Sequence, residues 1–251
     1  MEKLIEREHA TRNPLLAAPA LAVQFFLIPL GVVAVTVLIY VGFRSLITEQ
    51  RTAQDYLTEV QTGGTDRRWP AAYELSRQMA DPKVRADRGL AVSLVKAYEG
   101  SKDDDPRVRR YLALAIGQMD PPLPEQAIAD LTAALDDPDS ASRINAIWAL
   151  GSSGDPAVVP KVQPLFDSPD AGIRKMVVYA LGALPGDQQL PTLRAALHDA
   201  TPDVRWNAAV ALARHGSREG ESVLKQLTTC DACHWRRMGN MHCRTLLFSK
   251  S

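Results

Sequence analysis

The residues whose types and spacing could support redox chemistry lie at the C-terminal end of the 251-residue chain, where all three cysteines occur. Cys230, Cys233 and His234 form the pattern Cys-x-x-Cys-His, which is the attachment motif of c-type haem. The two thiols would bind the porphyrin through thioethers, and the imidazole would supply an axial nitrogen to the iron. The sequence therefore predicts a candidate haem c site. Three residues nearby are candidates for the sixth ligand: Met238, Met241 and His242.

The same stretch fits three other interpretations. Four of its side chains could hold a tetrahedral zinc ion, namely Cys230, Cys233, His242 and Cys243, although the last two are adjacent and their geometry is awkward. The first two cysteines could instead form a redox disulfide. The tail could also hold no cofactor, because the repeat pattern of the preceding chain is lost there. We expect no cofactor, with haem c as the alternative.

The elements that would position this tail are helices in a repeating array. Four arginines, called the repeat arginines below, are separated by 34, 31 and 31 residues: Arg109, Arg143, Arg174 and Arg205. Three, six and seven residues after each arginine stands an apolar residue, and these offsets lie on one face of a helix. A turn containing proline precedes each arginine, and an amphipathic segment precedes each turn. Two helices in each short period predict a helical solenoid.

The residue eight positions after each arginine indicates where the helix ends. It is Gly117, Gly151 and Gly182 in the first three units and Ala213 in the fourth. Glycine commonly follows a helix because it adopts a left-handed backbone conformation without steric cost. We therefore expect these glycines to mark helix C-termini.

The phrase Arg-x-x-Ala-x-x-Ala-Leu-Gly, from Arg143 to Gly151, follows a turn that contains aspartate and proline. It resembles the short HEAT-like repeats of the phycobilisome lyases, over roughly residues 66–227. The resemblance implies an all-α fold in which aspartates and arginines of neighbouring repeats bond to one another. By this resemblance all four repeat arginines are structural contacts between repeats, and not ligands.

The same resemblance leaves the function open, since that family includes pigment lyases, a peptidyl-lysine hydroxylase and many proteins that only bind partners. The hydroxylases hold iron with His-Glu pairs, whereas neither histidine of the array, His198 or His215, is followed by glutamate. The sequence also lacks a glycine-rich phosphate loop after a strand. It therefore predicts a protein that is not an enzyme, and it disfavours a lyase or hydroxylase activity.

The N-terminal part predicts a membrane anchor. The 29 positions from Leu15 to Phe43 hold no charged residue. A helix needs about 20 residues to cross a bilayer, whereas the apolar region of a cleaved signal is about 7 to 15 residues long. More positive residues precede the span than follow it, which favours a cytoplasmic N-terminus and repeats outside the cytoplasm. They are Lys3, Arg7 and Arg12 before the span, and Arg44 and Arg51 after it.

Together these patterns predict an all-α chain, with a single N-terminal transmembrane helix followed by an α-solenoid of about five HEAT-like helix pairs. The expected parts are an N-terminal flank (1–14), the transmembrane helix (15–43), a stalk or linker (44–65), the solenoid (66–229) and the tail (230–251). Equal numbers of basic and acidic residues, 29 each, argue against a nucleic-acid partner. We expect a scaffold or adaptor in the cell membrane that binds a partner protein, as an accessory subunit of a membrane complex. An electron-transfer subunit with one haem is the alternative.

Overall fold

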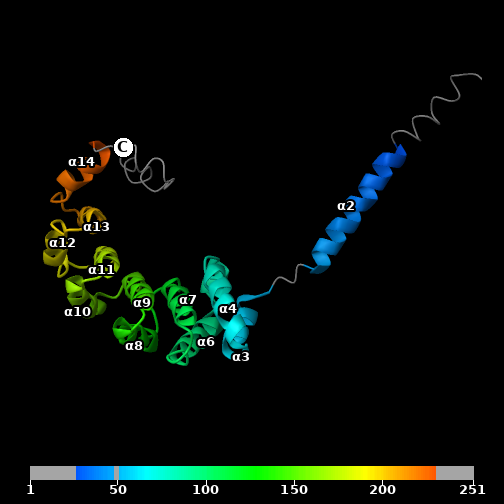
Figure 1. Ribbon diagram of the computed structural model, residues 1–251, viewed down its shortest axis with the longest axis horizontal. Coiled ribbons are helices and arrows are strands. Elements are labelled where there is room, and N and C mark those ends of the chain that lie inside the picture. The colour runs from blue at the N-terminus through cyan, green and yellow to red at the C-terminus, as the bar shows by residue number, and fades with distance from the viewer. Residues whose placement is uncertain (1–26, 48–50, 230–251) are drawn as a thin grey trace, which may run out of the picture. The chain divides into compact units, whose positions relative to one another are not determined.

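The computed structural model describes residues 27–47 and 51–229, and all regular structure within these ranges is helical (Figure 1). The chain divides into two units between Arg51 and Thr52, and each is described by itself.

The first unit contains one described helix, α2 (Ile28–Ile47). Its apolar side chains are exposed, as at Leu38, which is 71% exposed, and Phe43, which is 63% exposed. Among the described residues, no helix with the length and hydropathy of a membrane span is found. The predicted span begins at Leu15, and its residues 15–26 lie outside the described part of the chain. The structure thus does not support the predicted transmembrane helix.

The second unit is an array of antiparallel helix pairs. Its elements are α3 (Ala53–Thr62), α4 (Thr65–Gln78), α5 (Pro82–Arg85), α6 (Arg88–Glu99), α7 (Pro106–Gly117), α8 (Glu125–Ala133), η2 (Ala134–Asp136), α9 (Ser140–Ser152), η3 (Pro156–Val158), α10 (Val159–Val162), η4 (Gln163–Asp167), α11 (Ala171–Ala183), α12 (Leu190–Ala196), α13 (Pro202–Arg214) and α14 (Glu221–Thr229). The helices that carry the repeat arginines, α7, α9, α11 and α13, pack side by side in that order (Figure 1). The predicted helical solenoid is confirmed for this unit.

Aspartate side chains in the turns cap the N-termini of three of these four helices. Asp105, Asp139 and Asp170 occupy the N-caps of α7, α9 and α11, and each accepts a hydrogen bond from a backbone N–H of the first turn. Such caps satisfy donors that have no partner within the helix. The fourth helix, α13, begins instead with Pro202 in its first turn, which lacks an N–H and has the helical φ.

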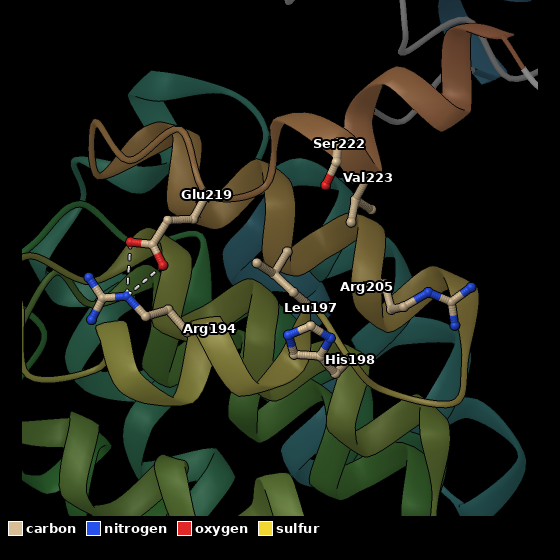
Figure 2. Close-up of a pocket in the computed structure, with 7 residues that line it drawn as sticks. All are labelled: Arg194, Leu197, His198, Arg205, Glu219, Ser222 and Val223. Carbon is tan, nitrogen blue, oxygen red and sulfur yellow. Dashed lines mark hydrogen bonds and ion pairs between the residues drawn. The ribbon is translucent and has the colours of Figure 1, made fainter.

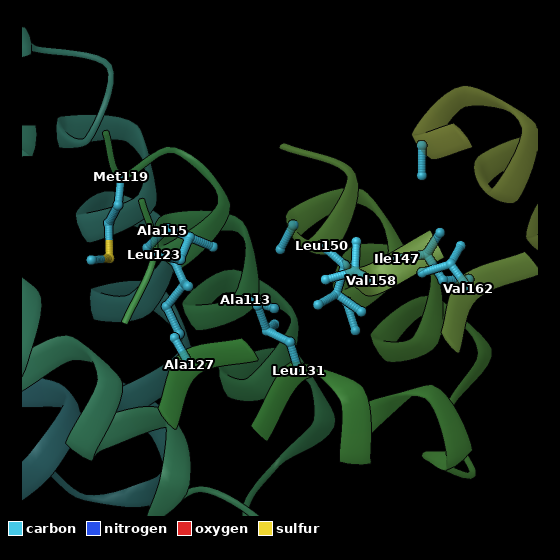
Figure 3. Packing of buried hydrophobic residues seen from close by; sticks show 14 of the residues in the cluster. Ala113, Ala115, Met119, Leu123, Ala127, Leu131, Ile147, Leu150, Val158 and Val162 are labelled. Atoms are coloured by element: carbon cyan, nitrogen blue, oxygen red, sulfur yellow. The ribbon is translucent and has the colours of Figure 1, made fainter. Parts of the chain in front are cut away.

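The core lies between the arginine-bearing helices and their partner helices. The residues three, six and seven positions after the repeat arginines are all at most 2% exposed, which confirms the predicted inward face. They are Leu112, Ala115, Ile116, Ala146, Ala149, Leu150, Val177, Ala180, Leu181, Ala208, Ala211 and Leu212. Figure 3 shows how Ile147, Leu150, Val158 and Val162 gather in one part of this core.

The three glycines expected at helix C-termini have a different role. Gly117 is the last residue of α7, Gly151 and Gly182 are the penultimate residues of α9 and α11, and none of the three has a left-handed φ. A Cβ built on Gly151 would lie 2.7 Å from the Cα of Ala180, and one on Gly117 would lie 2.7 Å from the Cα of Ala149. Glycine is needed at these positions because consecutive helices approach too closely for a side chain. The predicted position at the helix ends is confirmed, but the left-handed conformation expected there was wrong.

Two further segments differ from expectation. Residues predicted as a stalk form α3, which begins with a capping box between Thr52 and Asp55 and buries Leu57 and Val60 against the array. The second is the proline-containing partner segment at residues 156–167, which is divided into two 3₁₀ pieces flanking a four-residue α-helix. Proline at Pro160 and Pro164 removes backbone donors and so prevents a longer regular helix.

Candidate functional site

The residues predicted for haem or zinc, Cys230, Cys233, His234, His242 and Cys243, lie outside the described part of the chain. The haem, zinc, disulfide and cofactor-free interpretations therefore stay predictions. Within residues 27–47 and 51–229, no group of three or more His, Cys, Asp or Glu side chains is placed to hold a metal ion.

The repeat arginines share one anchoring contact. Each donates from Nη1 to a carbonyl oxygen of the turn that precedes its own helix, as Arg143 does to Asp137 at 2.6 Å and Arg205 does to Asp199 at 2.8 Å. The equivalent bond is 2.7 Å for Arg109 and 2.9 Å for Arg174. These bonds fix the guanidinium at the turn and leave its Nε and Nη2 edge for a second partner.

In two repeats that edge binds an aspartate of the next turn. Arg109 donates from Nε to Asp137 at 2.8 Å and from Nη2 to the same carboxylate at 3.2 Å. Arg174 binds Asp199 in the same way, at 2.8 and 3.1 Å. Bidentate pairs of this kind combine two charge-assisted bonds with a fixed geometry. They link successive repeats at their turns.

Pairing with arginine lowers the pKa of two carboxylates at these turns. Hydrogen bonds from the Arg174 guanidinium hold the pKa of Asp199 below its usual range. A neighbouring pair, Arg110 with Asp139, has the same effect, and the pKa of Asp139 is strongly lowered, chiefly by its bonds to Arg110. Both carboxylates are therefore ionised and paired at neutral pH.

Arg143 and Arg205 differ from the other two repeat arginines. Ser168 occupies the place after Arg143 that Asp137 and Asp199 occupy after Arg109 and Arg174, six residues before the next repeat arginine. Among the described residues, neither Arg143 nor Arg205 forms an ion pair with a carboxylate. Their side-chain contacts are bonds to carbonyl oxygens of their own turns.

A cluster of aromatic and arginine side chains on α4 and α7, which we call the aromatic–arginine cluster, was missed by the sequence analysis. It consists of Trp69, Tyr73, Arg77, Arg107 and Tyr111. The Arg107 guanidinium carbon lies 4.6 Å from the centre of the Trp69 ring, and the rings of Tyr73 and Tyr111 meet edge to face at 5.2 Å. A usable signal was present, because each member is four residues from the next on its helix.

The cluster is accessible from solvent. Tyr73 is 40% exposed, and the side chains of Arg77 and Arg107 are 63% and 50% exposed. Trp69 and Tyr111 are half-buried and pack against the core. Both arginines are paired with acidic side chains of their own segment, Arg107 with Asp105 and Arg77 with Glu74. The surface therefore presents packed rings beside exposed, ion-paired guanidinium groups.

A pocket of about 420 Å³ lies among the last described helices and is called the C-terminal pocket (Figure 2). Its lining comes from α12, α13, α14 and the connections between them: Arg194, Leu197, His198, Arg205, Glu219, Ser222 and Val223. Within it, Arg194 donates from Nε to both Glu219 oxygens, at 2.9 and 2.8 Å. These bonds lower the pKa of Glu219.

The sequence of the array matches the family model for HEAT repeats at residues 93–182 and 162–238. Among solved structures, the fold is similar to that of an engineered protein, with a TM-score of 0.53 and 20% identity over 74% of this chain and 92% of that one. This likeness concerns the fold alone.

Curated relatives match shorter stretches. Deoxyhypusine hydroxylase of Candida albicans is 33% identical over 90 residues, which are 35% of this chain and 28% of that protein. The uncharacterized phycocyanin operon protein Z of Pseudanabaena tenuis is 29% identical over 118 residues, which are 44% of this chain and 58% of that protein. The chain thus spans less than two thirds of the relatives it matches.

These relatives correct one prediction. The chain was expected not to be an enzyme, and the similarity to the deoxyhypusine hydroxylases of Candida albicans and Eremothecium gossypii contradicts that expectation. Their shared segments are short, so they indicate an enzymatic relative without assigning its activity here. The family itself is shown by the repeats: because the matched segments together cover more than half of the 251 residues, the chain belongs to the HEAT-repeat family.

Proposed function

We propose that this HEAT-repeat array is a scaffold that binds a partner protein through the aromatic–arginine cluster on α4 and α7. The observation that carries the proposal is the composition and exposure of this cluster. Trp, Tyr and Arg are the residue types that contribute most binding energy in protein interfaces. Here the rings are held by core packing and by one another, so little side-chain entropy is lost when a partner covers them.

We further propose that the array is held at a membrane, as part of a membrane complex. Support comes from the uncharged stretch from Leu15 to Phe43 and from the positive residues on either side of it. The distribution of those residues favours repeats outside the cytoplasm. If the anchor is retained, the chain should keep residues 1–43 and stay in the membrane pellet after a carbonate wash, whereas release into the supernatant would refute the anchor.

Partner binding can be tested by placing a photo-crosslinking amino acid at Tyr73 in cells. A matched control carries the same amino acid at Val92, which is 68% exposed on α6. Reproducible crosslinking of one protein from position 73 and not from position 92 is expected, and Arg107→Ala should reduce it. Equal products from both positions, or no dependence on Arg107, would refute the assignment of this surface.

The motif at Cys230, Cys233 and His234 supports a second candidate function, electron transfer by one c-type haem. A pyridine haemochrome spectrum of the purified chain tests it directly. A covalent haem signal that disappears in Cys230→Ala would establish the cytochrome, and its absence from protein made in a haem-attaching host would end that proposal.

A further inference from the structure

Arg205 is the last of the four repeat arginines. Like the others, its guanidinium donates hydrogen bonds to carbonyl oxygens of the preceding turn. Its Nη1 donates to the carbonyl oxygens of Asp199 at 2.8 Å and Ala200 at 3.0 Å. Arg174 makes the matching bonds, to Ser168 at 2.9 Å and Pro169 at 3.2 Å. The two side chains are therefore held at their turns by equivalent contacts.

The difference lies on the other edge of the guanidinium. In Arg109 and Arg174 the Nε and Nη2 atoms bind both oxygens of one aspartate from the following turn. No such carboxylate reaches this edge of Arg205 within the described residues. Because the anchoring bonds already restrict the side chain, a carboxylate that arrives there meets donors placed for a bidentate pair.

The acidic side chains nearest in sequence are paired elsewhere. Asp199 binds Arg174, Asp203 lies 3.7 Å from Lys175, and Glu219 binds Arg194. Consequently the C-terminal pocket contains one arginine, Arg205, whose charge is not matched by a carboxylate among its lining residues.

The lining of the pocket offers both charged and apolar side chains to an incoming group. Figure 2 shows the Arg194–Glu219 pair on one side and Arg205 on the other, with His198 and Leu197 between them. Leu197 and Val223 provide apolar surface, while Ser222 and His198 add polar groups. An acidic side chain could place its carboxylate at Arg205 and its aliphatic part against the apolar residues.

We propose that Arg205 and the C-terminal pocket form a carboxylate-binding site that receives an aspartate or glutamate side chain in the way Arg174 receives Asp199. This site is separate from the aromatic–arginine cluster, so it does not depend on the function proposed for that surface. The carboxylate has two sources to distinguish. One is another protein, and the other is this chain's Asp231, which follows Arg205 by 26 residues, within the spacings of 25 and 28 seen for Arg174–Asp199 and Arg109–Asp137.

The probe is a blocked peptide with the sequence of residues 135–141, Leu-Asp-Asp-Pro-Asp-Ser-Ala, which contains the aspartate that binds Arg109. The full chain, labelled with ¹⁵N-arginine, is titrated with it while the arginine Nε–H signals are followed by NMR. We expect a saturable shift of the Arg205 signal, and binding at least about tenfold weaker for a peptide with Asn in place of its second aspartate, because two charge-assisted bonds are lost.

Matched variants separate the site from general charge effects. Arg205→Ala should lose the binding, Arg205→Lys should weaken it because lysine lacks the planar fork, and Arg143→Ala should keep it. Unfolding curves confirm that each variant is folded. Equal binding by Arg205→Ala, or no shift at Arg205 in either the wild type or Asp231→Asn, would overturn the proposal.

Asp231→Asn identifies the source of the carboxylate. Tighter peptide binding by this variant would show that the chain's own aspartate competes for the site, and unchanged binding would assign the carboxylate to another molecule. Both results support a carboxylate site at Arg205.

Discussion

The helix contacts inside the array and the charge contacts at its turns follow different rules. Between consecutive arginine-bearing helices, the same small-residue contact recurs three times, with a glycine of one helix against an alanine of the next: Gly117 with Ala149, Gly151 with Ala180, and Gly182 with Ala211. At the turns, a bidentate pair forms after Arg109 and Arg174 but not after Arg143. The glycine–alanine contact is therefore the same between each of these helix pairs, whereas the ion pairs at the turns differ between repeats.

The physical reason is the difference in tolerance between backbone contact and side-chain pairing. A methyl group added at the helix contact clashes with the neighbouring helix, because protein interiors are packed as densely as organic crystals. Where the carboxylate is missing at a partly exposed turn, the arginine still donates hydrogen bonds to carbonyl oxygens, as Arg143 does. Substitutions in the two regions should therefore differ clearly in cost.

The largest effect is expected for Gly151→Ala. The new Cβ would lie 2.7 Å from the Cα of Ala180, a backbone atom that cannot move away by rotation of a side chain. We expect a loss of about 3 kcal/mol in the free energy of unfolding, at the upper end of the usual range for overpacking. Unfolding in denaturant measures this loss of stability. Gly154→Ala is not a suitable control, because Gly154 has a positive φ and alanine would be strained there.

Gly64→Ala is the better control, since nothing lies within 4 Å of a Cβ built there and its φ is −66°. It should change stability by less than about 1 kcal/mol. If Gly64→Ala and Gly151→Ala cost the same, close helix approach does not explain the glycine.

At the turns, Arg174→Ala should cost more than Arg143→Ala. The first removes two bonds to Asp199, whose side chain is only 7% exposed, and leaves that carboxylate unpaired. We expect a loss of about 2 kcal/mol for Arg174→Ala and about 1 kcal/mol for Arg143→Ala, which loses bonds to carbonyl oxygens only. Equal losses in thermal and denaturant unfolding would mean that the aspartate contributes nothing to the link between repeats.

The pH dependence of the same pair has a defined sign. The pKa of Asp199 is lowered in the folded state, chiefly by its bonds to Arg174, so its contribution to stability is present above the unfolded value of 3.8. That contribution is lost as the pH falls through the lower folded value. The stability difference between wild type and Arg174→Ala should therefore be constant from about pH 5 to 7 and shrink below about pH 4. A difference that stays constant on acidification would contradict this linkage.

The sequence was sufficient to predict the helices and their buried faces, but not the contacts between repeats. The period of the arginines and the apolar positions after them predicted the helices and their buried faces, because both depend on local spacing. The role of Gly151 was misassigned, since a glycine near a helix end has the same sequence signature whether it adopts a left-handed backbone or meets another helix. The ring contact of Tyr73 with Tyr111 joins residues 38 positions apart and requires the register between repeats.

The candidate site shows the same limit. The Arg110–Asp139 pair and the C-terminal pocket depend on which turns face one another, and spacing within one repeat does not contain that information. The predicted membrane helix rested on composition alone, and the described helix α2 did not add support for it.

The smallest effect, and the sharpest test of the idea that charge contacts are interchangeable, is expected for Ser168→Asp. In the two neighbouring repeats, the aspartate at this position accepts a 2.8 Å bond from the backbone N–H two residues later, and the Ser168 oxygen accepts the same bond at 3.2 Å. The turn is therefore already shaped for aspartate, and the new carboxylate would face the Nε and Nη2 edge of Arg143. A gain of about 1 kcal/mol in the free energy of unfolding is expected.

The matched variant is the double substitution Arg143→Ala with Ser168→Asp, in which the gain should disappear or reverse, because the added negative charge then lies between Asp167 and Asp170 in sequence without the arginine. If Ser168→Asp stabilises the chain equally with and without Arg143, the gain comes from capping the turn. In that case the aspartate at this turn does not depend on the arginine of the preceding repeat. The bonds of Arg109 and Arg174 to their aspartates would then add little to the stability of the array. A gain that requires Arg143 would instead show that every turn of the array retains the geometry for the link and that only the residue type decides whether it forms.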